Sequence, residues 1–194
     1  MELFREEQDE PARKQLAGII MENTGRLNNI VHDVMQLNRR DRAQAETLRL
    51  GDELRKFANE ICQAEHVAPD LLQVESPQDS EISFDRGHFN QVLWNLCANA
   101  MRHCSKQTGS VQLRAMPSGA GSMMLEVSDD GPGVAPEAEQ QLFEPFFTTE
   151  PGGTGLGLYI ARELCEANGA LLEYVRHGQG GACFRIVFGG ADER

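Results

Sequence analysis

Two asparagines and an arginine lie on what the sequence predicts to be one face of a helix. They belong to the run NLCANAMR at residues 95–102, and residues three or four apart face the same side of a helix. The amide oxygens of Asn95 and Asn99 suit Mg²⁺, whose other ligands can be phosphate oxygens and waters, and Arg102 could bind a phosphate. Taken alone, a hydrogen-bonded structural pair of asparagines explains the spacing equally well.

An acidic, glycine-rich run, VSDDGPGV at residues 127–134, directly follows a predicted strand. A carboxylate at a strand end, here Asp129, can accept a hydrogen bond from the exocyclic amine of an adenine. Gly131 and Gly133 permit close approach of the backbone and positive φ angles. A tight polar turn without any ligand would also explain this run by itself.

A second glycine-rich run, GGTGLGL at residues 152–158, leads into a predicted helix. The backbone amides of such a loop and the N-terminus of the following helix form a general cradle for phosphate. Before it, residues 142–149 read LFEPFFTT. The phenylalanines there could anchor a mobile lid or simply pack within the loop.

Hydrophobic patterning predicts the elements that position these runs. The predicted helices span residues 48–66, 89–104, 136–143 and 158–168, the last with a C-cap at Asn168-Gly169. The predicted strands span residues 71–75, 82–84, 111–116, 123–127, 171–176 and 182–188. This order indicates an α+β domain with helices on one face of a sheet.

A long helix with a coiled-coil seam is predicted ahead of this domain, from Ala12 to Arg40. The seam has heptad spacing and consists of Leu16, Ile20, Asn23, Leu27, Ile30, Val34 and Leu37. Such a seam favours a dimerisation helix, and packing on its own domain is the alternative. Pro11 suits a helix start, so residues 2–7 could end a preceding helix. The polar stretch 41–46 suggests a boundary between a helical segment, 1–45, and a domain, 46–194.

Composition narrows the classes of function. The 194 residues carry a formal net charge of −12, which argues against nucleic acid as the main partner because an acidic surface repels a phosphate backbone. Five cysteines without CxxC spacing indicate reduced thiols in a cytoplasmic protein. The first residues are too charged for a signal peptide, and no apolar run approaches the length of a membrane span.

The order and spacing of four runs, at residues 95–102, 127–134, 142–149 and 152–158, can be compared with those of known motifs. Together they resemble the asparagine, first glycine, phenylalanine and second glycine boxes of the catalytic domain of two-component sensor histidine kinases. The resemblance extends from about Leu48 to the C-terminus and is greatest to the nitrogen-regulator and pilus-regulator (NtrB and PilS) type. It implies the two-layer α/β sandwich of the Bergerat ATP-binding fold, here preceded by a long coiled-coil-type helix.

The resemblance also implies ATP and Mg²⁺ as cofactors and gives catalytic roles to the asparagine box. Asn95 would coordinate Mg²⁺, Asn99 would assist near the phosphates, and Arg102 would stand where the family has a basic phosphate ligand. Asp129 would hold the adenine amine. The other residues that the resemblance places around the nucleotide are Gly131, Gly133, Phe146, Phe147, Thr154, Gly155, Leu156, Gly157 and Leu158, with a lid over residues 134–153 secured by the two phenylalanines.

The phosphoacceptor motif of the family is missing from the sequence. That motif reads His-Glu-x-x-Asn-Pro or His-Glu-x-x-Thr-Pro, and no such string occurs. His32-Asp33 lacks the proline, and the run RLNNIV at residues 26–31 resembles the second helix of the acceptor hairpin. The remaining histidines are expected to be ordinary surface or packing residues: His66, His88, His103 and His177.

We therefore expect a truncated kinase that binds ATP but does not autophosphorylate by itself. The resemblance implies three partners: a nucleotide, the acceptor hairpin of the same kinase in a homodimer, and a response regulator. It also implies a cytoplasmic domain and is compatible with a parent protein anchored in the inner membrane.

Three other functions remain open at this point. ATP-driven clamps of the gyrase, heat-shock chaperone or mismatch-repair type share the fold, but they hydrolyse ATP with a glutamate in the asparagine-box helix, and residues 89–104 contain none. Serine/threonine kinases of anti-sigma partners share it too, although the heptad helix argues against them. A dimerisation and nucleotide-binding module without kinase activity is the non-enzymatic alternative, and the intact Asn95, Asp129 and GTGLGL set argues against it.

Overall fold

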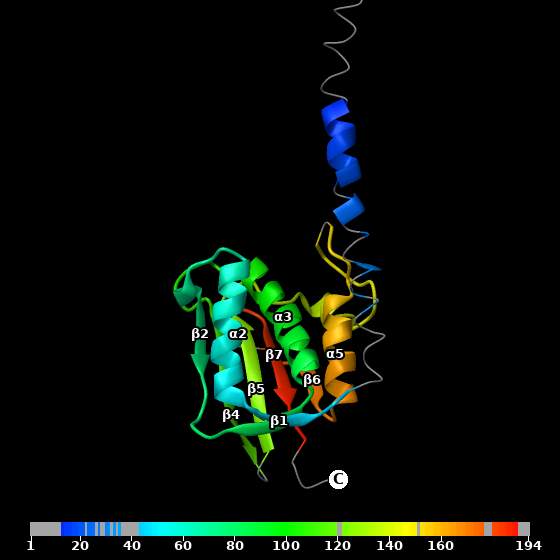
Figure 1. Cartoon of the computed structure of the whole chain (residues 1–194). Coiled ribbons are helices and arrows are strands. Elements are labelled where there is room, and N and C mark those ends of the chain that lie inside the picture. The colour runs from blue at the N-terminus through cyan, green and yellow to red at the C-terminus, as the bar shows by residue number, and fades with distance from the viewer. Residues whose placement is uncertain are drawn as a thin grey trace, which may run out of the picture.

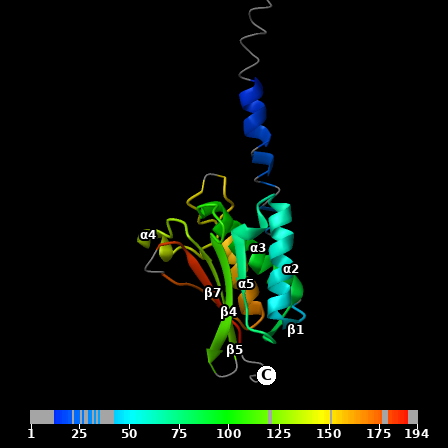
Figure 2. The ribbon, with the colours of Figure 1, turned by 90° about the vertical axis from the view of Figure 1, so that its left-hand side faces the viewer.

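A five-stranded mixed sheet forms one layer of the domain, and helices form the other (Figures 1 and 2). The computed structural model describes residues 13–21, 23–25, 27, 30–31, 33, 35, 43–119, 122–150, 152–176 and 180–189. The strands are β2 (Leu72–Glu75), β4 (Val111–Gly119), β5 (Ser122–Asp129), β6 (Leu171–Tyr174) and β7 (Cys183–Val187). Their order is β2-β4-β5-β7-β6, with β2 parallel to β4 and the other neighbours antiparallel. The predicted α+β sandwich is confirmed.

The helical layer consists of α2 (Leu50–Ala64), α3 (Arg86–His103) and α5 (Gly157–Ala167), which cover one face of the sheet (Figure 2). Fully buried side chains such as Leu93 of α3, Ile160 of α5 and Leu125 of β5 meet between the layers. Two short helical turns, η2 (Pro69–Leu71) and α4 (Pro136–Glu139), lie in the connections. All five cysteines are buried and free of disulfide bonds.

The helix that carries the asparagines is fixed at its start by a side-chain cap. The carboxylate of Asp85 accepts a hydrogen bond from the backbone N–H of His88 at 2.9 Å, which satisfies one donor of the first helical turn. Helix α3 therefore begins three residues before the predicted position. Asn168, at the end of α5, accepts from the backbone N–H of Asp85 at 2.8 Å and donates to the carbonyl of Leu164 at 2.7 Å. One buried amide thus ties the start of α3 to the end of α5.

One strand was not predicted. Residues Glu46–Arg49 form β1, which pairs antiparallel with β3 (Glu81–Phe84), whereas the sequence predicted a helix starting at Leu48. Leu48 is fully buried opposite Ile82. The pairing partner lies more than thirty residues away in the chain, so a local pattern could not reveal that this segment completes a sheet.

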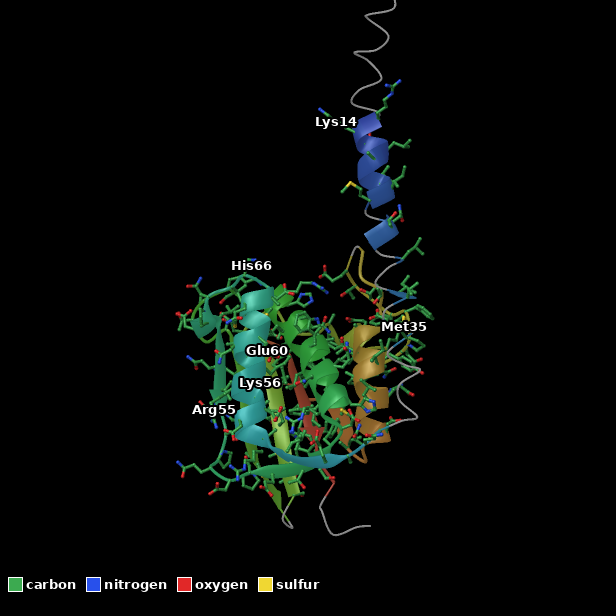
Figure 3. The ribbon with its side chains drawn as sticks, viewed as in Figure 1. Lys14, Met35, Arg55, Lys56, Glu60 and His66 are labelled. Atoms are coloured by element: carbon green, nitrogen blue, oxygen red, sulfur yellow. The ribbon has the colours of Figure 1, made fainter. Side chains whose placement is uncertain are left out.

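The outer face of the large sheet carries a row of alternating charges. Glu75, Arg114, Glu126, Arg185 and Glu173 lie opposite one another on successive strands in the sheet order. Their ion pairs measure 3.0 Å (Arg114–Glu75), 2.7 Å (Arg185–Glu126) and 3.3 Å (Arg185–Glu173). Opposite charges on directly facing strand positions stabilise the pairing register. Charged side chains also occupy the outer face of helix α2. Arg55, Lys56 and Glu60 of this face point away from the sheet (Figure 3).

The described residues between 13 and 35 are helical, as predicted, and this helix projects beyond the domain (Figure 1). Figure 3 shows Lys14 at its far end and Met35 next to α5. The seam side chains Leu16, Ile20 and Leu27 are 61%, 57% and 62% exposed. The predictions for residues 2–7, His32, Val34, Leu37 and His177 concern positions outside the described residues, and the division at residue 45 stays a prediction. None of the helices within the described residues is long and apolar enough to cross a membrane.

Candidate functional site

A cleft of about 930 Å³ opens between α3, the end of β5, the loop after it and the start of α5. It brings together most of the residues predicted from the sequence, which come from segments far apart in the chain. The predicted residues that line it are Asn95, Asn99, Arg102, Asp129, Gly133, Phe147, Thr154, Gly155, Gly157 and Leu158. The other three, Gly131, Phe146 and Leu156, lie next to the cleft without lining it.

Asn95 presents a buried amide to this cleft. Its Oδ1 accepts a hydrogen bond from Nε2 of Gln91 at 3.4 Å, and its Nδ2 is buried without a hydrogen-bond partner among the described residues. A Cβ placed on Gly157 would lie 3.8 Å from Asn95 Oδ1, so the first turn of α5 comes close to this amide. Because a buried unpaired amide costs free energy, its position suits a polar ligand that supplies the missing partner. The two amide atoms can exchange places by a flip of the side chain.

Asp129 ends β5 with its carboxylate held from two directions. Its Oδ1 accepts from the backbone N–H of Gly131 at 2.9 Å and of Ala182 at 3.3 Å. Burial raises the pKa of Asp129 above its ordinary value, and the two backbone donors and the nearby His103 oppose that rise. Since both bonds are made by Oδ1, Oδ2 is the oxygen that could accept an amino group from a ligand.

Glycines are required in the loop beside Asp129. A Cβ on Gly131 would lie 2.5 Å from the carbonyl oxygen of His103, and Gly133 has φ +75° with its Cβ position 2.8 Å from the carbonyl oxygen of Gly181. The Gly181 N–H donates to the Gly131 carbonyl at 2.8 Å. Gly181, just before β7, therefore packs closely against this loop, a contact that the sequence, read as a simple hairpin, did not predict.

In the loop before α5, one hydroxyl group, that of Thr154, makes two of the hydrogen bonds. Thr154 Oγ1 accepts from the backbone N–H of Leu156 at 3.3 Å and donates to Oδ2 of Asp33 at 2.8 Å. Gly155 has φ +68°, and a Cβ there would lie 2.4 Å from the backbone of Phe146. The Phe146 N–H in turn donates to the Gly155 carbonyl at 2.9 Å. The side chain of Leu156 is buried in the core.

The predicted anchoring of the lid needs one correction. The ring of Phe146 is 67% exposed, so its contact with the glycine loop is made by the backbone and its ring does not secure the lid. Phe143 is the packed ring. Its centroid lies 6.2 Å from the ring centroid of Phe184 of β7 and 5.5 Å from Cζ of the Arg162 guanidinium of α5. Arg162 and Phe143 thus join the segment to the rest of the domain through a cation–π contact.

Several polar and aromatic residues of the cleft were not predicted as site residues, among them His103, Trp94 and Asp33. His103, expected to be a surface or packing residue, lines it, and its Nδ1 lies 3.8 Å from Oε1 of Glu150. Its place four residues beyond Asn99, on the same helix face, could have indicated this. Trp94 and Asp33 also line the cleft. Nothing in the sequence points to Asp33, because its contact joins two segments 121 residues apart.

A family match agrees with this geometry. The family described as "Histidine kinase-, DNA gyrase B-, and HSP90-like ATPase" matches residues 84–190. The sensor protein kinase PilS of Pseudomonas aeruginosa is 40% identical over 186 residues, which is 94% of this chain and 35% of that protein. The sensor histidine kinase ZraS of Salmonella typhimurium is 29% identical over 173 residues, 89% of this chain and 37% of that protein. The chain thus spans about a third of the length of these relatives.

Solved structures give the same result. Full-length ShkA in complex with AMPPNP matches with a TM-score of 0.70 and 27% identity, over 90% of this chain and 38% of that one. The histidine kinase AdeS of Acinetobacter baumannii matches in fold with a TM-score of 0.68 and 22% identity, over 95% of this chain and 86% of that one. The chain belongs to the family of histidine kinase-, DNA gyrase B- and HSP90-like ATPases, and within it to the catalytic domains of sensor histidine kinases.

Proposed function

We propose that the chain binds Mg-ATP in this cleft and presents the γ-phosphoryl group to a histidine of an acceptor hairpin, from which a response regulator takes it. One observation carries the proposal: Asn95, Asp129 and the loop at Thr154, which lie far apart in the sequence, line a single cleft. The names of PilS and ZraS as sensor kinases and the AMPPNP bound to ShkA support it.

Asp129 would select the adenine. Its Oδ1 is fixed by two backbone donors, Gly131 and Ala182, so Oδ2 is held ready to accept the exocyclic amine. Apolar residues that line the same cleft, Leu142 and Phe184, provide surfaces for the faces of a base. Preorganisation of this kind reduces the entropy lost on binding.

The phosphates would lie toward Asn99, Arg102 and the start of α5. Arg102 can donate two parallel hydrogen bonds to a phosphate, and the N-terminus of α5 attracts negative charge. Asn95 would hold Mg²⁺, which when bound draws negative charge from the phosphate oxygens. In the described part of the chain no three His, Cys, Asp or Glu side chains form a metal cluster, so phosphate oxygens would supply further ligands, as is usual for this ion.

In the transfer, a nitrogen of the acceptor histidine forms a bond to the γ-phosphorus while the bond to the bridging oxygen of ADP breaks, and the histidine loses its proton. The protein acts mainly by positioning and by stabilising charge. Helix α3 carries no Asp or Glu, so it offers no carboxylate to activate water, which favours transfer over hydrolysis. We also propose that the domain acts as a homodimer in the cytoplasm, where ATP and response regulators occur.

Calorimetric titration with Mg-ATP tests the proposal. We expect saturable binding by the chain and by Asp79→Asn, an exposed aspartate away from the cleft at a positive φ that asparagine tolerates. Asp129→Asn should bind at least about tenfold more weakly, since it loses a charge-assisted hydrogen bond. No binding by the unmodified chain would contradict the proposal and favour a binding module without kinase activity.

A second assay addresses the kinase step. Because the sequence contains no acceptor motif, an acceptor hairpin would be supplied as a separate protein together with radiolabelled ATP. We expect label on the histidine of the hairpin and none when Asp129→Asn replaces the chain. Binding of ATP without any transfer would leave a nucleotide-binding domain and contradict the kinase activity.

A further inference from the structure

The helix that precedes the domain reaches into the cleft through one side chain. Asp33 lies among the residues lining the cleft, and its Oδ2 accepts a hydrogen bond from Thr154 Oγ1 at 2.8 Å. In Figure 1 this blue segment passes beside the yellow lid and the start of α5. The domain and its preceding helix therefore meet at the loop that would hold the phosphates.

The contact occupies two hydrogen-bond donors of that loop, the Thr154 hydroxyl and the Leu156 N–H. A threonine hydroxyl has a single hydrogen to donate, and here it is directed to Asp33. The same hydroxyl oxygen accepts the backbone N–H of Leu156 at 3.3 Å, the residue that precedes the first turn of α5. Neither group can donate to a phosphate until this arrangement opens.

The contact also places a carboxylate where an anion would bind. An ionised carboxylate a few ångströms from a phosphate repels it, most strongly where water is excluded. The terminal phosphate of ATP carries charge that ADP lacks. A carboxylate at that end of the cleft therefore disfavours ATP more than ADP.

We propose that Asp33 is an autoinhibitory gate on the phosphate loop, which holds Thr154 and excludes the γ-phosphate while the preceding helix lies against the domain. This inference rests on the proposed ATP site and adds a means of regulating it. Movement of the helix frees Thr154 and Leu156 and raises the affinity for ATP relative to ADP. By linkage, ATP binding favours release of the helix from the cleft to the same extent.

Two variants of Asp33 separate the charge from the hydrogen bond. Asp33→Asn keeps an oxygen that can accept from Thr154 and removes the charge, whereas Asp33→Ala removes both. Asp79→Asn changes the net charge of the chain by the same amount at an exposed site outside the cleft and serves as the matched control. Calorimetry would give the affinities of all four proteins for Mg-ATP and Mg-ADP.

We expect both Asp33 variants to bind ATP about tenfold more tightly than the unmodified chain, with a change for ADP of less than about threefold. The gain for Asp33→Asn should shrink as salt is added, because salt screens the repulsion. Equal gains for ATP and ADP, or an ATP affinity that is unchanged or weaker, would overturn the gate. A failure of every variant to bind either nucleotide would instead overturn the proposed ATP site itself, so the two failures are distinguishable.

Discussion

Asn95 is a single residue at which stability and proposed binding are in conflict. Its Nδ2 is buried without a hydrogen-bond partner among the described residues, which lowers the free energy of unfolding. A bound metal or phosphate would instead make use of this amide. We expect Asn95→Leu, similar in shape, to leave the free energy of unfolding unchanged or raised, because an apolar group needs no partner. Its affinity for Mg-ATP should fall at least about tenfold.

Metal removal identifies what the amide contacts. If Asn95 holds Mg²⁺, the unmodified chain and Asn95→Leu should bind ATP with similar, weak affinities once EDTA is added. Urea unfolding and calorimetry measure the two quantities. A variant that is less stable but binds Mg-ATP normally would show that Asn95 is a structural residue.

The ionisation of Asp129 determines how we expect nucleotide affinity to depend on pH. The carboxylate must be ionised to accept the adenine amine, and burial raises its pKa. Affinity should therefore be full above the raised pKa and be lost as the pH falls through it, at a higher pH than for an ordinary aspartate, whose pKa is 3.8. The same shift means that the free energy of unfolding falls as the pH rises between the ordinary and the raised pKa.

The ratio of two affinities isolates this titration. The nucleotide titrates equally with both proteins, so its contribution cancels in the ratio of the affinities of the unmodified chain and Asp129→Asn. That ratio should decline toward one as the solution is acidified. A ratio independent of pH would exclude Asp129 as the group that binds the base.

At the scale of elements, the sequence predicted those with strong local patterns. Helices α3 and α5 and the strands of the large sheet appear near their predicted positions, because amphipathic spacing and caps are local signals. Strand β1 was missed since its pairing with β3 is a tertiary contact. The same limit applies to the site: Asp129 stands in a recognisable run, whereas the contributions of Gly181 and Asp33 depend on segments that meet only in the fold.

The junction between α3 and α5 gives a prediction about stability. Asn168 is buried, and its amide accepts a hydrogen bond from the Asp85 N–H and donates one to the Leu164 carbonyl. Its Nδ2 also lies 3.0 Å from Nδ1 of His88. Asn168→Ala leaves these buried groups unpaired, so we expect the free energy of unfolding to fall by about 2–3 kcal/mol. Urea denaturation measures it.

A matched substitution checks that this loss comes from burial. Gln63→Ala removes an amide from the exposed face of α2 and should change the free energy of unfolding by less than about 0.5 kcal/mol. Equal effects of the two substitutions would mean that the buried amide does not join the helices.

For the whole molecule, the residues around the cleft and the preceding helix differ in how their apolar side chains are covered. The domain buries its own core between sheet and helices, whereas the helix exposes Leu16, Ile20 and Leu27. Apolar side chains at heptad spacing are stabilised when a second helix covers them. The described residues therefore combine a packed core with a helix whose apolar side chains are exposed, and the two parts meet at Asp33.

The oligomeric state tests the open seam. Ile20→Glu places a charge within the seam, so we expect the chain to dimerise in sedimentation equilibrium and the variant to remain monomeric at the same concentration. Gln15→Glu introduces the same charge on the same helix outside the predicted seam and should dimerise like the unmodified chain. Because Ile20 does not line the cleft, Mg-ATP affinity should be the same in all three proteins. An unmodified chain that is monomeric at every concentration would show that this helix alone does not supply the interface.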